Sequence, residues 1–184
     1  MKKLIAIALL SATAIPAYAA VGDGTFYVGA DVGQAKASGN VTTGANDTSN
    51  TAYGLSVGYQ FNRNWAAELG YTDFGTLDYG AAAGGGNSKT NAVSLSALGI
   101  WPLDNGFSLL GKLGVAGTSV DYSPALGGGS TNRRTGAVVG LGGQYNFTTA
   151  FGVRVAYDRF WVGSSSNNTD GSLNLLTAGV VYRF

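Results

Sequence analysis

The carboxyl-terminal segment, Ser172 to Phe184, alternates between two kinds of side chain. One set is apolar and ends in two aromatic residues: Leu176, Ala178, Val180, Tyr182 and Phe184. The intervening set is mixed: Leu175, Thr177, Gly179, Val181 and Arg183. Because successive side chains of a β-strand point to opposite faces, this segment is predicted to be a strand with one fully apolar face. The pattern constrains the fold strongly, since such a face must be covered by protein or by lipid.

Seven earlier segments carry the same alternation, and turn-forming sequences separate them. The expected strands are 25–34, 51–61, 65–74, 91–101, 107–120, 133–147, 150–162 and 172–184. The connections alternate between short turns at 62–64, 102–106 and 148–149 and long polar loops at 35–50, 75–90, 121–132 and 163–171. This alternation indicates an up-and-down antiparallel order in which all the long loops lie at one end.

The second face of each expected strand, opposite the apolar face, distinguishes a membrane barrel from two alternative folds, a soluble sandwich and a lipocalin-like barrel. In the soluble folds the second face is polar and solvated. Here it is mostly Gly, Ala and Ser, which suits the narrow interior of a small closed barrel, and Gly occurs 30 times. Aromatic residues also gather at both ends of the strands, as in interfacial girdles. We therefore predict an all-β, eight-stranded antiparallel up-and-down transmembrane β-barrel, with short periplasmic turns and long extracellular loops.

The amino terminus has the features of a secretory signal peptide. Lys2 and Lys3 precede a short apolar stretch, and Ala17-Tyr18-Ala19 fits the small-x-small cleavage rule. The expected domains are a cleaved signal peptide, 1–19, and an outer-membrane barrel, 20–184. Cleavage removes two Lys and no acid, so the formal net charge falls from +1 to −1. A balanced charge gives no support for nucleic-acid binding.

Four short motifs are spread over the predicted barrel. They are Thr25-Phe26-Tyr27-Val28-Gly29-Ala30, Glu68-Leu69-Gly70-Tyr71, 106–114 and 142–157. In these motifs and in strand spacing, nearly all of the mature chain resembles the transmembrane domain of OmpA-like eight-stranded outer-membrane barrels. The resemblance implies a Gram-negative outer membrane and insertion by the barrel-assembly machinery, with Tyr182 and Phe184 as its assembly signal. Full-length members continue into a periplasmic peptidoglycan-binding domain; this sequence ends at Phe184, so cell-wall anchoring is not expected.

Charged residues are few on the inward faces of the expected strands. The predicted lumen charge cluster consists of Asp31, Glu68, Lys112 and Arg154, with Asp158 and Arg183 nearer the strand ends. A charge in a narrow lumen must be paired or hydrated. The resemblance implies a Glu68–Arg154 pair, which in the family has been discussed as a gate. Leu98 and Gln144 stand where members carry a Lys and a second acid, so a switch of Glu68 between two salt bridges is not expected. A structural ion-pair network is favoured over a gated pore.

Basic residues near the long loops are candidate contacts for the phosphates of lipopolysaccharide. The candidates are Arg159, Arg133 and Arg134, and Lys36 and Lys89 lie near the same end. Arg159 counts onto the lipid face just above Tyr157, which makes it the best single candidate. The alternative is ordinary solvated charge at the bases of the loops.

Enzymatic readings find little support. The sequence has no His, which excludes a Ser-His-Asp device, and no Cys, which excludes disulfides and Cys metal sites. Asp73 and Asp78 are a weak cation candidate, because acids in Gly-rich loops are usually solvated. We expect no catalytic activity, cofactor or metal, and a monomer. The predicted function is membrane integrity or surface interaction, such as adhesion or host contact, through four extracellular loops; a narrow diffusion channel is the alternative.

Overall fold

The computed structural model describes residues 24–38, 49–79, 86–124, 130–162 and 171–184. The strands are β1 (Thr25–Ser38), β2 (Ser49–Gln60), β3 (Trp65–Tyr79), β4 (Gly86–Pro102), β5 (Phe107–Pro124), β6 (Ser130–Asn146), β7 (Phe151–Val162) and β8 (Gly171–Arg183). A short 3-10 turn, η3 (Asp104–Gly106), precedes β5. None of the described residues forms a helix long and apolar enough to cross a membrane. The predicted signal peptide lies outside the described residues.

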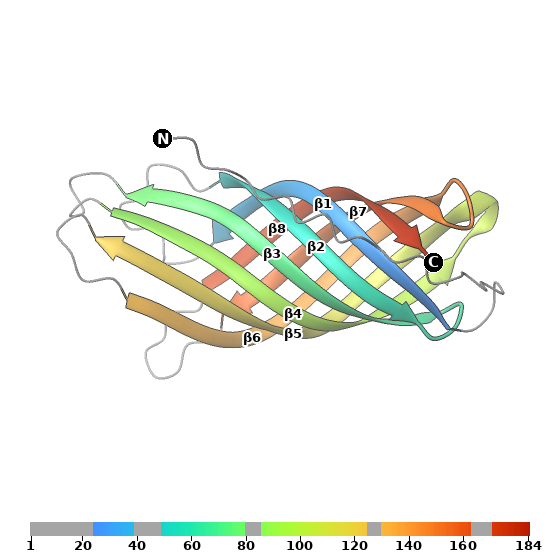
Figure 1. Ribbon diagram of the computed structural model, residues 1–184, viewed down its shortest axis with the longest axis horizontal. Helices are drawn as coiled ribbons and strands as arrows, with labels where there is room; N and C mark the ends of the chain where they lie inside the picture. The colour runs from blue at the N-terminus through green and yellow to red at the C-terminus, as the bar shows by residue number, and fades with distance from the viewer. Residues whose placement is uncertain (1–23, 39–48, 80–85, 125–129, 163–170) are drawn as a thin grey trace.

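Each strand pairs antiparallel with its sequence neighbours, and β1 also pairs with β8 (Figure 1). The sheet therefore closes, and every strand has a partner on both sides. Where neighbouring ladders overlap, closure leaves no strand edge, so the backbone donors and acceptors of that part of the barrel have partners within the sheet. The predicted eight-stranded up-and-down barrel is confirmed.

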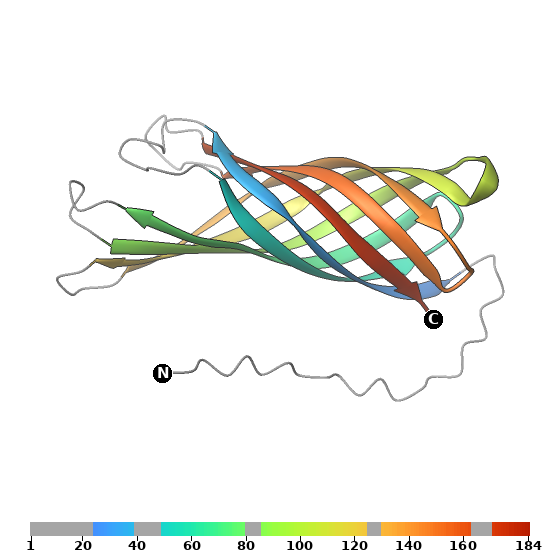
Figure 2. The same ribbon diagram turned by 90° about the horizontal axis from the view of Figure 1, so that it is seen from above.

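The strands run farther into the expected long loops than the sequence indicated. The β3–β4 ladder extends to the pair Tyr79 and Gly86, and the β5–β6 ladder to Tyr122 and Ser130, so the expected loops 75–90 and 121–132 are partly strand. Figure 2 shows these two hairpins projecting beyond the other strands at the end opposite the carboxyl terminus. Polar sequences suggested loops, but an antiparallel ladder pairs through the backbone and continues without an apolar face.

Burial separates the two faces of the sheet. The outward leucines Leu141, Leu113 and Leu55 are 73, 65 and 63% exposed, whereas the inward Ala52 and Val138 are fully buried. A soluble barrel would bury its large apolar side chains and solvate the other face. The outer wall of this barrel is therefore suited to lipid, and the soluble alternatives do not fit.

The short turns are held by local hydrogen bonds and by permissive backbone. The side-chain oxygen of Asn62 accepts from the backbone N–H groups of Asn64 and Trp65, both at 2.9 Å. The Thr148 hydroxyl accepts from the N–H of Phe151 at 2.9 Å. In η3, Asn105 has a φ of 60°, in the left-handed region that Asn tolerates better than most residues. These turns fix the register of the strands that they join.

Aromatic side chains form three similar clusters beside the short turns. In each cluster a Tyr lies two residues before a Phe of the same chain segment and also contacts a Phe of the neighbouring strand. The clusters are Phe26–Tyr59–Phe61, Phe107–Tyr145–Phe147 and Phe151–Tyr182–Phe184, with ring centroids 4.5–5.2 Å apart. Offset and edge-to-face contacts of this kind add to the burial of each ring. Together they form an aromatic girdle at the short-turn end.

Candidate functional site in the barrel lumen

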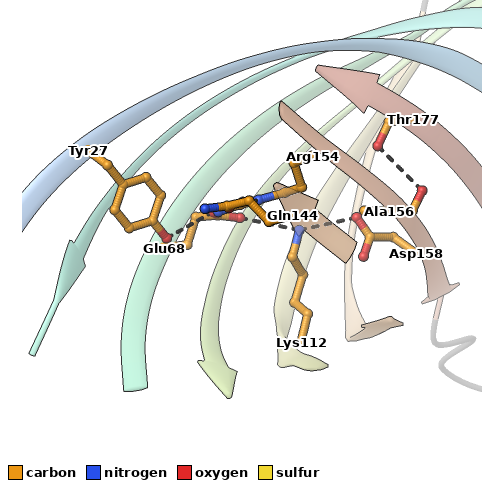
Figure 3. Close-up of polar contacts among 8 residues, drawn as sticks. All are labelled: Tyr27, Glu68, Lys112, Gln144, Arg154, Ala156, Asp158 and Thr177. Carbon is orange, nitrogen blue, oxygen red and sulfur yellow. Dashed lines mark hydrogen bonds and ion pairs between the residues drawn. The ribbon is translucent and has the colours of Figure 1, made fainter. Parts of the chain in front are cut away.

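A network of ions crosses the lumen, centred on Glu68 of β3. Its Oε2 accepts from Nη1 of Arg154 on β7 at 2.7 Å and from the hydroxyl of Tyr27 on β1 at 3.0 Å. Its Oε1 lies 3.2 Å from Nζ of Lys112 on β5, and Lys112 Nζ lies 3.1 Å from Oδ2 of Asp158 on β7. Figure 3 shows Glu68 between Tyr27 and Lys112. Glu68 is thus contacted from three other strands, so these contacts link distant parts of the barrel wall.

Glycines on neighbouring strands make room for these long side chains. A Cβ atom added at Gly58 would overlap the Tyr27 ring, and one at Gly140 would overlap the Asp158 carboxylate. Both glycines are buried and face inward. The high Gly content of the inward faces is therefore the counterpart of a lumen crossed by large polar groups in a small barrel.

The structure brings together three of the four predicted cluster residues, Glu68, Lys112 and Arg154. Asp31 borders a small cavity beside these residues, but it makes no hydrogen bond or ion pair with any residue that the structure describes. Asp158, which the sequence placed nearer the strand end, is the fourth ion of the network. The alternation of side chains along β7 already placed Asp158 on the inward face. Its contact with Lys112 could not be predicted, because it depends on how β5 and β7 lie relative to each other in the closed barrel.

Two uncharged members of the network were missed by sequence reasoning. Tyr27 donates to Glu68, and Oε1 of Gln144 accepts from Nε of Arg154 at 3.1 Å. The Arg154 guanidinium also lies over the Tyr27 ring, 5.5 Å from its centroid. Strand parity was the available signal, because both residues count inward, but parity does not show which polar side chains meet.

Glu68 contacts a second cation besides Arg154. Lys112 Nζ lies 3.2 Å from Glu68 Oε1. Leu98, at the position where the resemblance implies a Lys, is the register partner of Lys112 across the β4–β5 ladder, so Lys112 lies beside that position, one strand along. Because Glu68 contacts Lys112 and Arg154 at once, through different oxygens, it does not have to exchange between them.

Apolar layers lie on both sides of the ion network. The layer toward the long loops takes one side chain from each of the eight strands: Ala35, Ala52, Phe74, Ala92, Ala116, Val138, Phe160 and Leu175. Phe74 on β3 and Phe160 on β7 reach across the lumen and meet edge to face, with centroids 5.4 Å apart. The layer toward the short turns consists of Tyr27, Ala66, Leu98 and Val181.

A small cavity remains beside the network. Its volume is about 50 Å³, and Asp31, Glu68, Lys112, Arg154 and Asp158 all border it. One water molecule needs about 10–15 Å³ of cavity volume, so the cavity has room for only a few water molecules. Within the described residues, the lumen is thus occupied by an apolar layer, an ion network with a small cavity, and a second apolar layer.

The predicted assembly residues lie at the seam where the barrel closes. Phe184 donates its backbone N–H to the carbonyl of Phe26 at 3.0 Å, and Tyr182 contacts Phe151 in the aromatic girdle. The Phe184 ring also packs edge to face on the Tyr182 ring, with centroids 5.0 Å apart, so both side chains belong to the girdle of the folded barrel. Their role as an assembly signal stays a prediction.

The basic residues proposed for lipopolysaccharide do not form one group. Arg159 is exposed on the outer wall, and its guanidinium lies over the Trp161 ring, 5.5 Å from the centroid. Arg133 and Arg134 are adjacent in β6 and so leave opposite faces of the sheet. Arg159 pairs in register with Val139, six residues from Arg133, which separates the two arginines by roughly 20 Å along the strand.

The structure does not support a cation-binding site at Asp73. Asp73 Oδ2 lies 3.2 Å from Lys89 Nζ, and Oδ1 accepts from the N–H of Gly75 at 2.9 Å. The side chain of Asp78 lies outside the described residues. No group of three or more acidic, His or Cys residues suited to a metal occurs in the part of the chain that the structure describes.

Known proteins resemble this chain in sequence and in fold. The family model of the OmpA-like transmembrane domain matches residues 22–184. Outer membrane protein A of Yersinia pseudotuberculosis is 29% identical, over 98% of this chain and 54% of its own length. Outer membrane protein P5 of Haemophilus influenzae is 30% identical, over 100% of this chain and 61% of its own length. The chain thus spans about half the length of the curated relatives it matches.

Solved structures share the fold. Neisserial surface protein A matches with a TM-score of 0.67 and 18% identity, over 86% of this chain and 97% of its own. Ail, the attachment invasion locus protein of Yersinia pestis, solved with the heparin analogue sucrose octasulfate, matches with a TM-score of 0.63 and 19% identity, over 88 and 99%. With the closed barrel and the match over 22–184, the chain belongs to the family of OmpA-like transmembrane domains and is an outer-membrane β-barrel protein.

Proposed function

We propose that the barrel is a closed scaffold that supports membrane integrity and presents its extracellular hairpins for surface contact, without catalysing a reaction or conducting solutes. The observation that carries this proposal is the apolar layer to which all eight strands contribute one side chain. Water and ions cross an apolar constriction poorly, because the layer offers no polar partner for a hydrated solute.

The ion network supports the same reading. Glu68 is 4% exposed and is held by two cations and a hydroxyl. Opening a path past it would break several buried charged contacts at once, and a charge left unpaired in such a place costs about 3–5 kcal/mol. The network therefore serves as a rigid internal brace between strands.

The projecting hairpins support a role in surface contact. Ail, which has a similar fold, was solved with the anionic sugar analogue sucrose octasulfate. In this protein Arg133 and Arg134 are exposed in β6, toward the long-loop end. Guanidinium groups suit sulfate and phosphate oxygens, so anionic glycans are the ligand class to test on this end of the barrel.

Planar-bilayer recordings of the refolded chain test the closed scaffold. The unchanged protein should show no reproducible unitary conductance. Glu68→Ala tests the channel alternative, and Asp73→Ala, which removes an acid outside the lumen network, is the matched control. Reproducible unitary conductance of the unchanged protein that changes in Glu68→Ala but not in Asp73→Ala would contradict the closed scaffold and establish the narrow channel.

Surface contact is tested separately with anionic glycans. The refolded protein in lipid nanodiscs should bind an immobilised sulfated glycan more tightly than the Arg133→Ala/Arg134→Ala variant does. Arg63→Ala, which changes a short turn at the opposite end, is the control. Equal binding by all three proteins would remove this support for surface contact.

A further inference from the structure

Strands β3 to β6 form a sheet that continues beyond the other strands at the long-loop end, and this sheet has two open edges. The β2–β3 ladder ends at Asp73, whereas β3 stays paired with β4 as far as Tyr79. The β6–β7 ladder ends at Val138, whereas β6 stays paired with β5 as far as Ser130. Among the described residues, each of these two strand ends therefore has a paired neighbour on one side only, in the hairpins that project in Figure 2.

The two edges carry opposite charges. Residues 76–79 of β3, the acidic edge, include Asp78 and no basic residue. Residues 130–137 of β6, the basic edge, include Arg133 and Arg134 and no acid. Both arginines are exposed, and they project from opposite faces of the sheet. An open edge presents backbone donors and acceptors with which a further strand can pair, and cross-strand pairs of opposite charge stabilise such a ladder.

The charges of the two edges stand at the same height on the barrel. Asp78 lies 13 residues beyond Trp65, at the short turn before β3, and Arg134 lies 13 residues from Phe147, at the short turn after β6. At about 3.3 Å per residue and a tilt of about 40°, both positions are roughly 33 Å above the short turns. The apolar band of such barrels is about 25 Å tall, so these charges lie above the lipid, in water. Two barrels side by side in one membrane therefore hold them at matching heights.

Strand direction decides which edges of neighbouring copies can pair well. Copies of an outer-membrane barrel share one orientation, with their short turns toward the periplasm. β3 runs toward the long loops and β6 runs away from them, so β3 of one copy and β6 of the next meet as an antiparallel pair. Two β6 edges would run parallel, which is the less stable pairing, and would bring arginines beside arginines.

We propose that the acidic edge of one copy pairs with the basic edge of a second copy, so that the projecting sheet continues from barrel to barrel. The contact joins two different surfaces, so further copies add in the same way and form a row rather than a symmetric dimer. The acidic edge is short, so the ladder is weak in dilute detergent and gains from the high local concentration of copies in a membrane. This row differs from the monomer expected from the sequence, and it is independent of the closed lumen and of glycan binding.

Disulfide cross-linking tests the pairing of the two edges, because the chain has no Cys of its own. With Asp78 opposite Arg133, an antiparallel ladder sets Thr76 opposite Thr135. The full chain carrying Thr76→Cys and a differently tagged copy carrying Thr135→Cys are refolded together into lipid vesicles and oxidised. We expect a cross-linked product that contains both tags. Ser119→Cys, at a similar height on β5 but inside the sheet, is the matched control for Thr76→Cys and should give about tenfold less, since only random collisions join it to the basic edge.

Charge exchange between the edges locates the contact. Arg133→Glu/Arg134→Glu in the copy with Thr135→Cys should lower the yield of the mixed product about tenfold, because attractive cross-strand pairs become repulsive. Asp78→Lys in the other copy should then restore the yield, which a local effect of the arginines on their own hairpin would not allow.

Unchanged gel mobility before boiling checks that each variant is folded. If the charge-reversed variant fails to fold, Arg133→Gln/Arg134→Gln replaces it and should still lower the yield. In folded proteins, an equal yield with Ser119→Cys, an equal yield from Thr135→Cys alone, or no recovery with Asp78→Lys overturns the pairing of the two edges.

Discussion

Two bridges join β3 to β7 across the lumen, and they hold the wall by different physics. One is the edge-to-face contact of Phe74 with Phe160, which lies in a layer of small and apolar side chains. The other is the ion pair of Glu68 with Arg154, at 2.7 Å, which lies in a network that also includes Lys112 and Asp158. The strands are the same, so the comparison isolates the kind of contact.

The two bridges differ in how well each tolerates the removal of a side chain. In the apolar layer, a truncated side chain leaves a void, and the free energy of unfolding falls in proportion to the volume of that void. In the ion network, a lost group leaves its partner charged, buried and without compensation. Asp158 Oδ1 and Ser96 Oγ are buried without a hydrogen-bond partner among the described residues, so the polar groups of this region are incompletely compensated before any of them is removed. We expect the ionic bridge to be the more fragile one.

The largest effect should come from Glu68→Ala. It leaves Arg154 and Lys112 facing each other with Asp158 as the only remaining acid of the network, and should lower the free energy of unfolding by about 4 kcal/mol. Urea unfolding in lipid vesicles, followed by gel mobility, measures the loss. Asp73→Ala is the control: it breaks the more exposed Asp73–Lys89 pair and should lose less than about 1 kcal/mol. Similar losses in both variants would remove the contrast between the bridges.

Phe74→Ala should destabilise the barrel by about 3 kcal/mol, because it removes the contact with Phe160 and leaves a void in the apolar layer. A double-mutant cycle with Phe160→Ala should give a coupling of about 1 kcal/mol. Phe151→Ala lies in the girdle and should combine additively with Phe74→Ala. Strict additivity of Phe74→Ala with Phe160→Ala would show that the two rings do not support each other.

Removing both ends of the ionic bridge should harm the barrel less than removing one. Glu68→Leu/Arg154→Met should be more stable than Glu68→Leu alone by about 2 kcal/mol, since no buried Arg is then left unpaired. The same urea unfolding measurement applies. A double variant that is less stable than either single variant would show that the pair has a structural role beyond mutual neutralisation.

The smallest effect should come from Asp31→Asn. Asp31 borders the cavity but makes no ion pair or hydrogen bond with the described residues, so its replacement should change the free energy of unfolding by about 0.5 kcal/mol or less. Asp158→Asn, which weakens a 3.1 Å contact with Lys112, should lose more. Equal losses would make Asp31 a full member of the network.

Side-chain alternation was sufficient to predict the strands but not where they end. Period-two patterning located all eight strands, since lipid and lumen select opposite side chains. At 75–90 and 121–132 the pattern lapses into polar residues, and a loop was predicted where β3 continues to Tyr79 and β5 to Pro124. Beyond the membrane neither face has to be apolar, so hydrogen bonds continue a ladder that the sequence pattern no longer marks.

The alternation of side chains along each strand also predicted which charged residues face inward. It did not predict which of these residues contact one another. Lys112 reaches Glu68 across β4, and Asp158 joins through Lys112 rather than through Arg154 on its own strand. Lys36 and Arg159 are far apart in sequence, and the seam of the barrel places both beside Asn174. Such neighbours depend on the register and curvature of the closed sheet, which no local pattern encodes.

The sequence by itself determined the medium on each face of the wall, the strand order and the family, because these follow from local alternation and from the lengths of the connections. Only the tertiary structure decided that Phe74 meets Phe160, that Glu68 holds two cations at once, and that the lumen is filled. The physical reason is closure: joining β1 to β8 brings side chains from opposite strands within contact distance. Phe184 lies at that junction, where its backbone N–H binds Phe26.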